Sequence, residues 1–452
     1  MEEFDCIVLG AGSGLTVASQ YANRGKQVAV VEPGPMGGTC LNRGCIPSKM
    51  LIHHADVAKT IKESEKFHID SSFEGLDFSA ITSEVSETVD EDAESIERGI
   101  KKSDNHTLYK TEGKFVDNKV IEVDEEKITA DQIVIAAGTR PMVPPIEGLD
   151  EVDYITSKEA LRLEEQPEEL VIIGGGYIAT ELAHFYGSLG TDISIIEMGD
   201  SLVGREDREV SEKFTEMFSE KYDVNLGLKA SKVEEEQDKI KVTAEDKEGN
   251  TKEFSGDELL VAAGRVPNTD NLKLEENTDI ETDERGFVET DRTLETGVEG
   301  VYALGDIAGN WAFKHSANLE AEYVVRNALF DQEKEPDYTA MPHAIFSDPE
   351  VSGVGKTEQE LEEEGAEYSV GKYPYKKTGR GMALKEEGFV KVLADPDGNI
   401  LGCHIIGPHA SSILHEVLVA MRHGSGKISD IKNTIHIHPA LNEVVERAFR
   451  QV

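Results

Sequence analysis

Residues 4–14 read FDCIVLGAGSG, an apolar run that leads directly into a turn rich in glycine. A helical pattern follows over residues 15–24, and a second apolar run over residues 27–31 ends at Glu32. Strand, glycine turn, helix, strand and acid in this order predict a βαβ unit that binds a dinucleotide. The glycines let the phosphates approach a helix N-terminus, and the acid accepts hydrogen bonds from the ribose. Leu15 stands where the third glycine usually falls, so the prediction depends on the surrounding elements as well as on the glycines.

A second copy of this pattern begins at Leu170, as LVIIGGGYIATELAHFYGSLG followed by TDISIIE. Gly174, Gly176 and Ala179 occupy its three small positions, and Glu197 ends its second strand. Two such units predict an α/β protein with two Rossmann-like nucleotide-binding domains.

A pair of cysteines follows the first unit directly, in GGTCLNRGCIPSK at residues 37–49. Residues five apart in a regular helix have α-carbons about 8 to 9 Å apart, whereas a disulfide requires about 4.4 to 6.8 Å. The backbone between Cys40 and Cys45 must therefore depart from a helix. Gly44 permits this, and Pro47 suits the first turn of a following helix. That helix places Lys49 one turn from Cys45, where an ammonium group and a helix N-terminus both favour a thiolate. We predict a redox-active cysteine pair.

A zinc site and two inert cysteines are the alternatives to a redox pair. Zinc takes about four ligands and usually has shorter cysteine spacing. The other two cysteines, Cys6 and Cys403, each stand alone in an apolar run. We therefore expect no metal site.

The C-terminal third has alternating patterns typical of strands in HAIFSDPEVSGVG, FVKVLA and ILGCHIIG, and ends with IHIHPALNEVVE at residues 435–446. Reduction of a disulfide requires a general acid for the leaving thiolate, and histidine titrates in the useful range. Glu443 can fix the tautomer of His438 and support its imidazolium form. Alone, a His-Pro sequence would more often be a structural turn. Together with a separate cysteine pair it favours catalysis.

The motif GGTCLNRGCIPSK resembles, along its whole length, the redox motif of the class I flavoprotein disulfide reductases. This family includes glutathione reductase, dihydrolipoamide dehydrogenase, mycothione reductase and mercuric reductase. The resemblance covers essentially the whole chain. It implies a glutathione reductase-like fold with an FAD domain at residues 1–145 and 265–335, an NAD(P) domain at residues 146–264 and an α+β dimerisation domain at residues 336–452. It also implies a homodimer whose active sites are shared between the subunits.

The same resemblance assigns residues to the two cofactors. For FAD it implies Gly10, Gly12, Ser13, Gly14, Glu32, Gly38, Thr39, Lys49, Gly113, Ala137, Gly138, Asp306 and His315. For the nicotinamide nucleotide it implies Gly174, Gly176, Tyr177, Ala179, Glu197 and Gly264. His315 could equally be a residue of a helix surface.

The mechanism implied by the resemblance passes hydride from NAD(P)H to FAD and electrons from the flavin to the Cys40–Cys45 disulfide. Cys40 then attacks the substrate disulfide, and the partner subunit's His438, supported by Glu443, protonates the released thiol. Cys45, nearer the flavin, forms the charge-transfer thiolate. The remaining residues that it implies are Tyr177, which lies over the flavin, and the pair Lys49 and Glu181, which tunes it.

The choice between NADH and NADPH stays open in the sequence. A carboxylate at Glu197 should accept the ribose hydroxyls of NADH and repel a 2′-phosphate. Against this, Ala179 is common in relatives that use NADPH, and Arg205 and Arg208 follow close enough to reach a phosphate. Either arginine could instead balance the acidic surface.

The chain is strongly acidic. Asp and Glu number 89 against 46 Lys and Arg, a formal net charge of −43. This charge indicates either an ordinary acidic surface or adaptation to a high-salt cytoplasm, where salt screens self-repulsion, and we favour the second. It disfavours nucleic acid and anionic membranes as partners. The start MEEFDCIVLG has no signal-peptide pattern and no apolar run reaches membrane-span length, so a cytoplasmic protein is expected.

Several substrates fit the family. The end ERAFRQV lacks the extra cysteine pair of mercuric reductases, which disfavours that activity. Glu197 supports dihydrolipoamide dehydrogenase. The segments KHSANLEAE and IHPALNEVVE instead resemble mycothione reductase, and with the halophilic composition they favour a reductase of bis-γ-glutamylcystine or a similar small disulfide. A non-catalytic flavin-binding protein is disfavoured because both cysteines and His438 are present. Arg326 could bind a substrate carboxylate, but an exposed helix position fits it better.

Overall fold

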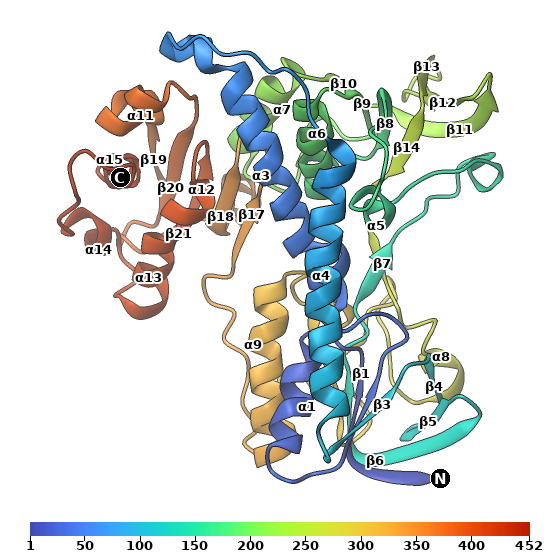
Figure 1. The fold of residues 1–452 in the computed structure, drawn as a ribbon. Helices are drawn as coiled ribbons and strands as arrows, with labels where there is room; N and C mark the ends of the chain where they lie inside the picture. Colours follow the sequence, from blue (N-terminus) through green and yellow to red (C-terminus); the bar gives the residue numbers. More distant parts are fainter. The chain divides into compact units, whose positions relative to one another are not determined.

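The computed structural model describes residues 1–452 (Figure 1). The chain forms two compact units. The first consists of residues 1–50, 80–142 and 264–338, and the second of residues 51–79, 143–263 and 339–452. The three-domain division expected from the sequence is finer than this, and its bounds stay a prediction.

A seven-stranded sheet forms the centre of the first unit. Because its central strands run parallel, they end at one edge, where open α/β sheets bind their ligands. The parallel strands are β3 (His106–Tyr109), β2 (Val28–Val31), β1 (Glu2–Leu9), β6 (Glu126–Ile135) and β16 (Val301–Ala303), and the antiparallel ones are β5 (Val120–Val123) and β4 (Gly113–Asp117).

Strand β1 shows why this sheet is buried on both faces. Its residues Cys6 and Val8 belong to a core that includes residues of α1 (Gly14–Ala22) and α9 (Lys314–Val324). The alternate residues Ile7 and Leu9 pack into a second core with β4, β5 and the chain around β16. A near-continuous apolar sequence is what a parallel strand covered on both sides requires.

The second unit contains a smaller parallel sheet followed by an antiparallel one. The parallel strands are β10 (Asp223–Leu226), β9 (Asp192–Glu197), β8 (Glu169–Ile173) and β14 (Glu258–Val261). Helix α6 (Tyr177–Leu189) joins β8 to β9, which completes the second βαβ unit predicted from the sequence. The antiparallel strands are β11 (Lys229–Glu236), β12 (Lys239–Glu245) and β13 (Thr251–Gly256).

A five-stranded antiparallel sheet carries the C-terminal part of this unit. Helices α13 (His415–His423) and α15 (Glu443–Phe449) pack against it through Val417, Val444 and Phe449, which are buried. The strands are β17 (Pro342–Ile345), β18 (Val351–Gly355), β21 (Ile400–Ile406), β20 (Phe389–Ala394) and β19 (Ser369–Pro374).

Strand β20 buries a lysine among carboxylates. The Lys391 side chain is fully buried, and its ammonium lies 2.8 Å from Asp207, 3.0 Å from Glu209 and 2.6 Å from Glu358. Burial alone would raise the pKa of Asp207, but the hydrogen bond from Lys391 and further contacts lower it overall. The buried cation therefore joins the segment before α7 (Arg208–Ser219) to the C-terminal sheet.

The remaining elements are short or lie between the sheets. They are α2 (Gly38–Arg43), α3 (Cys45–Lys62), α4 (Phe78–Lys101), β7 (Thr139–Pro141), α5 (Ser157–Ala160), β15 (Arg265–Pro267), α8 (Leu274–Asn277), α10 (Glu358–Glu364), α11 (Gly379–Leu384), α12 (Ala410–Ile413) and α14 (Ile428–Lys432). No helix is both long enough and apolar enough to cross a membrane.

Candidate active site

The first glycine turn has the geometry of a dinucleotide site. Gly10 has a φ of 104°, and a Cβ there would lie 2.3 Å from the Ala136 carbonyl oxygen, so only glycine fits. The carboxylate of Glu32 accepts hydrogen bonds of 2.8 Å from the backbone N–H groups of Ala11 and Gly34. A carboxylate has about four lone-pair sites. Glu32 therefore keeps capacity for the hydroxyls of a ribose.

The departure at Leu15 has a structural explanation. The third glycine of the usual pattern allows close packing of helix and strand. Here Gly14 takes that part, because a Cβ on it would lie 2.8 Å from Val8 Cγ1 and 2.9 Å from Ala136 Cβ. The close approach is thus moved by one residue along α1.

The second glycine turn repeats this arrangement in the second unit. Gly174 has a φ of 113°, and a Cβ there would lie 2.5 Å from the Ala262 carbonyl oxygen. Glu197 accepts hydrogen bonds of 2.6 Å from the N–H groups of Gly175 and Gly199. Ala179 is fully buried in α6. Both predicted acids are therefore held at the ends of their strands in the same way.

The cysteine pair stands on either side of a helix break, as the spacing requires. Helix α2 ends at Arg43, and Gly44 adopts φ −153° and ψ −119° before α3 begins at Cys45. A Cβ on Gly44 would lie 2.9 Å from the Thr39 carbonyl oxygen. The break thus brings Cys40 and Cys45 within hydrogen-bonding distance of each other as thiols.

The surroundings of Cys40 act on its thiol in opposite directions. The hydrogen bond with Cys45 and burial both raise the pKa of Cys40, and the nearby ammonium of Lys314 lowers it. Lys314 is the first residue of α9 and donates a hydrogen bond of 2.9 Å to Ser13 Oγ. The sequence did not single out Lys314, because no local pattern shows that it lies between the glycine turn and the cysteines.

The first unit fits FAD at the predicted positions. The turn at Gly38, with a φ of 66°, lies against Gly12, where a Cβ would meet the Gly12 α-carbon at 2.8 Å. Asp306 follows β16 and accepts a hydrogen bond of 3.0 Å from Thr139, directly after Gly138. Glu32 would hold the adenosine ribose, the two glycine turns the pyrophosphate and Asp306 the ribityl chain.

Three further predicted residues of the first unit have defined surroundings. Gly113 is buried against the side chains of β1, β2 and β5, within 3.0 to 3.3 Å of where a Cβ would stand. His315 is exposed and its ring stacks on Phe313 at 5.2 Å. Gly264 has a φ of 131°, which favours glycine.

The predicted pair of Lys49 and Glu181 involves residues of different units and stays a prediction. Within the first unit, Lys49 donates a hydrogen bond of 3.3 Å to Ser48. Within the second, Glu181 is buried on α6 and accepts a hydrogen bond of 2.9 Å from the N–H of Phe346. Tyr177 is 44% exposed at the start of α6.

His438 and Glu443 form the predicted dyad. The Nδ1 atom of His438 lies 2.9 Å from a carboxylate oxygen of Glu443. The His438 side chain is 78% exposed, whereas that of Glu443 is 10% exposed. Because the carboxylate can only accept, Nδ1–H donates and the other ring nitrogen is left to exchange a proton with a substrate.

A second histidine–glutamate pair fixes the segment that carries His438. His436 Nε2 lies 2.9 Å from one carboxylate oxygen of Glu416 on α13, and Asn442 donates a hydrogen bond of 2.9 Å to the other. The neighbours Ile435 and Ile437 are 98% and 78% exposed. Glu416 thus ties both ends of the segment 436–442 to the helix. The sequence gave no signal of this pair, because the partners lie twenty positions apart.

The other predicted alternatives can be placed as well. Cys6 and Cys403 are buried thiols, and no group of three or more His, Cys, Asp or Glu residues is arranged to hold a metal ion. Arg208 pairs with Glu362 at 2.9 Å. Arg326 is exposed and lies over the Tyr323 ring at 4.9 Å.

The chain belongs to the pyridine nucleotide-disulphide oxidoreductase family. The family description matches residues 4–321, and that of the family's dimerisation domain matches residues 341–449. This confirms the predicted class of flavoprotein disulfide reductases, its glutathione reductase-like fold and an enzyme that acts on sulfur groups. The family uses FAD and a nicotinamide nucleotide.

Individual relatives fall into two named activities. The chain is 36% identical over 464 residues to mycothione reductase of Mycobacterium tuberculosis, covering 99% of both chains. It is 35% identical over 461 residues to dihydrolipoyl dehydrogenase 2 of Haloarcula marismortui, covering 98% of this chain and 95% of the relative. Among solved structures, the HOCl-induced flavoprotein disulfide reductase RclA of Escherichia coli superposes with a TM-score of 0.88 at 26% identity, covering 99% of this chain and 100% of that one.

Proposed function

We propose that the protein is an FAD-dependent NAD(P)H:disulfide oxidoreductase that reduces the disulfide of a small cellular thiol, of the bis-γ-glutamylcystine or mycothione type. The observation that carries the proposal is the combination of a cysteine pair across the Gly44 break with a His438–Glu443 dyad. Similarity to mycothione reductase over 99% of both chains supports the substrate class.

The residues of this chain have separate parts in the proposed reaction. FAD, when bound, passes the reducing equivalents of NAD(P)H to the Cys40–Cys45 disulfide. The Cys40 thiolate then attacks the substrate disulfide, so that a mixed disulfide forms and one substrate thiolate leaves. His438 gives that thiolate a proton. Cys45 next attacks Cys40, which releases the second thiol and restores the Cys40–Cys45 disulfide.

NADH is the proposed hydride donor. Glu197 is fixed by two backbone N–H groups in the position that Glu32 has in the first turn. A carboxylate there accepts the ribose hydroxyls of NADH and repels a 2′-phosphate. Of the two arginines that could oppose this, Arg208 already pairs with Glu362.

The protein is also proposed to be a cytoplasmic homodimer adapted to high salt. The dimerisation domain supports the dimer, and Ile435 and Ile437, beside His438, expose apolar surface that a second subunit would cover. Two buried free thiols fit a reducing compartment. The net charge of −43 supports salt adaptation, which predicts weaker stability against unfolding at low KCl. A flat profile of stability against KCl would contradict it.

Dihydrolipoamide dehydrogenase is the second candidate, because Glu197 and the Haloarcula relative both favour it. The test is NADH and NADPH consumption by the FAD-loaded protein in molar KCl, with bis-γ-glutamylcystine and lipoamide compared at equal concentrations. A preference for bis-γ-glutamylcystine is expected. A preference for lipoamide would establish the second candidate, and inactivity on both would reject a small thiol of this type.

A further inference from the structure

The second unit contains a basic segment that stands out in this acidic chain. Residues 368–385 read YSVGKYPYKKTGRGMALK, with five basic residues and no acidic one. Acidic residues outnumber basic ones 89 to 46 over the whole chain. A uniformly acidic surface does not predict such a segment, so its local excess of positive charge calls for a physical reason.

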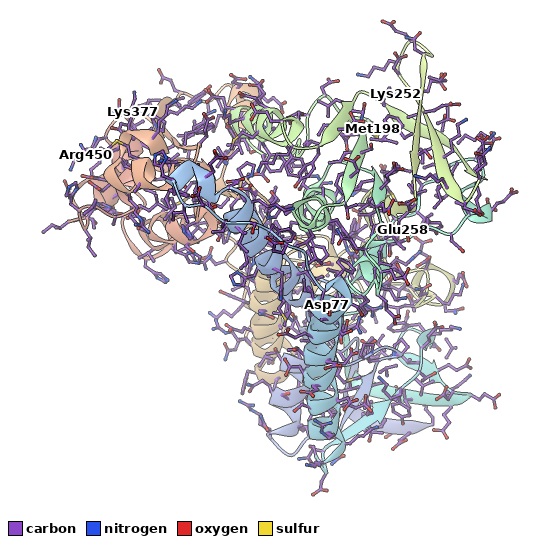
Figure 2. The ribbon with its side chains drawn as sticks, turned by 45° about the horizontal axis from the view of Figure 1, so that its top comes forward. Asp77, Met198, Lys252, Glu258, Lys377 and Arg450 are labelled. Carbon is purple, nitrogen blue, oxygen red and sulfur yellow. The ribbon has the colours of Figure 1, made fainter.

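Two cations at the centre of this segment are not used within the subunit. Lys372 forms an ion pair of 2.8 Å with a glutamate, and Lys376 lines a surface cavity together with Glu387. Lys377 and Arg380, in contrast, are exposed and form no ion pair. Figure 2 labels Lys377 at the edge of the C-terminal part of the chain, drawn in orange.

The backbone that carries these two cations is held firmly. Tyr375 is fully buried, and its hydroxyl donates a hydrogen bond of 3.1 Å to the Pro408 carbonyl. Thr378 caps α11 by accepting a hydrogen bond of 3.2 Å from the N–H of Gly381. A Cβ on Gly381 would lie 1.9 Å from the Tyr375 carbonyl oxygen, so the turn closes only with glycine there. Residues 377–380 are therefore presented in one fixed position.

This turn lies against the residue that follows His438. Gly379 stands between the two cations, and a Cβ on it would lie 3.3 Å from Pro439 Cβ. Both the turn and His438 belong to the second unit. The two exposed cations thus flank a residue in contact with the proposed general acid's own neighbour.

We propose that Lys377 and Arg380 form a subsite that binds the carboxylates of an anionic disulfide substrate beside His438. This rests on the proposed function and narrows its substrate class. A net charge of −43 repels anions at a distance, so an enzyme with an anionic substrate needs cations at the site itself. Bis-γ-glutamylcystine carries carboxylates and lipoamide carries none, so the subsite favours the first.

Three small disulfides of similar length separate charge from other recognition. They are 3,3′-dithiodipropionate, with two carboxylates, bis(2-hydroxyethyl) disulfide, which is uncharged, and cystamine, with two ammonium groups. At about 1 M KCl the Debye length is about 3 Å, so contact pairs remain while the field of the whole protein is screened. We expect kcat/KM to be highest for the dicarboxylate and lowest for cystamine.

The variant K377Q/R380Q tests the residues, with K127Q/K229Q as the control. Lys127 and Lys229 are exposed and form no ion pair, so the control removes the same charge elsewhere. An exposed ion pair contributes up to about fivefold. We therefore expect the ratio of kcat/KM for dithiodipropionate over the uncharged disulfide to fall about tenfold in K377Q/R380Q only. Flavin content and thermal unfolding check that both variants fold. An unchanged ratio, or a preference for cystamine in the unmodified enzyme, would overturn the subsite.

A binding measurement keeps the two proposals distinguishable. Suberate has the length of dithiodipropionate but cannot be reduced, so its binding to the FAD-loaded protein, followed by ligand-observed NMR, needs no turnover. Binding that K377Q/R380Q loses and K127Q/K229Q keeps supports the subsite even if all three disulfides are inert, a result that would reject the proposed function alone. Equal suberate signals for the unmodified protein and K377Q/R380Q would reject the subsite while disulfide turnover could stand.

Discussion

Replacement of Glu443 by Gln tests the part of the dyad that the structure describes most fully. The Glu443 carboxylate accepts a hydrogen bond of 2.9 Å from His438 Nδ1–H, and its side chain is only 10% exposed. A Gln side chain at this position offers an N–H donor as well as an acceptor, so the ring is no longer held in one tautomer. The variant should therefore protonate the leaving thiolate less well.

The expected loss follows from the kind of hydrogen bond. A bond to a charged group is worth about 1.5–3 kcal/mol, which corresponds to about a 10- to 150-fold fall in kcat. The burial of Glu443 leaves little water to replace the lost interaction. The assay is steady-state turnover of the disulfide substrate. Reduction of ferricyanide through the flavin serves as an internal control, because it needs no thiol protonation.

A matched variant on the same helix separates this effect from general damage. Glu446 is one turn from Glu443 on α15, with a side chain 14% exposed and an ion pair of 2.8 Å to Arg450. Glu446→Gln should leave kcat within about twofold, since a peripheral ion pair contributes little. Equal disulfide turnover in Glu443→Gln and Glu446→Gln would refute the reasoning about the dyad.

Three further predictions concern other parts of the chain. Lys391→Met should lower the free energy of unfolding by about 3–5 kcal/mol, because it leaves Asp207 buried without its partner, and denaturant unfolding should show part of this loss restored in Lys391→Met/Asp207→Asn. Glu197→Ser should lower the ratio of kcat/KM for NADH over NADPH by about tenfold or more, because it removes a charged acceptor for the ribose hydroxyls; an unchanged ratio would exclude Glu197 from nucleotide choice. Burial alone would raise the pKa of Asp348, but two lysine ammonium groups lower it overall. The stability that Asp348 contributes is therefore present above its unfolded pKa near 3.9 and lost as pH falls toward the lower folded pKa, so urea unfolding at pH 7 and pH 4 should show the stability difference between the unmodified protein and Asp348→Asn shrinking at pH 4.

Local sequence determines the features that the sequence predicted well. The glycine turns, the acids at the ends of β2 and β9, and the helix break at Gly44 each depend on residues close together in the chain. Steric limits on a Cβ and the spacing of a disulfide are local properties, so they can be read before the fold is known. The family resemblance added the dyad at His438 and Glu443, which the geometry brings together.

Features that depend on tertiary packing escaped the sequence. In FVKVLA, Lys391 looks like a polar residue on the exposed face of a strand, but β20 is buried throughout and three carboxylates from other elements surround the ammonium. The contact between Glu416 and His436 and the position of Lys314 near Cys40 likewise join distant parts of the chain. The unpaired cations Lys377 and Arg380 could have been suspected from the acid-free composition of their segment.

The central claim is that reducing equivalents pass through the cysteine pair to a substrate disulfide, and Cys40→Ser tests it most directly. The measurement is NAD(P)H oxidation by the FAD-loaded Cys40→Ser protein in molar KCl, with the disulfide substrate in one reaction and ferricyanide in another. The account predicts that disulfide reduction is lost while ferricyanide reduction continues, because only the first needs the Cys40 thiolate. Full disulfide turnover by Cys40→Ser would contradict the account.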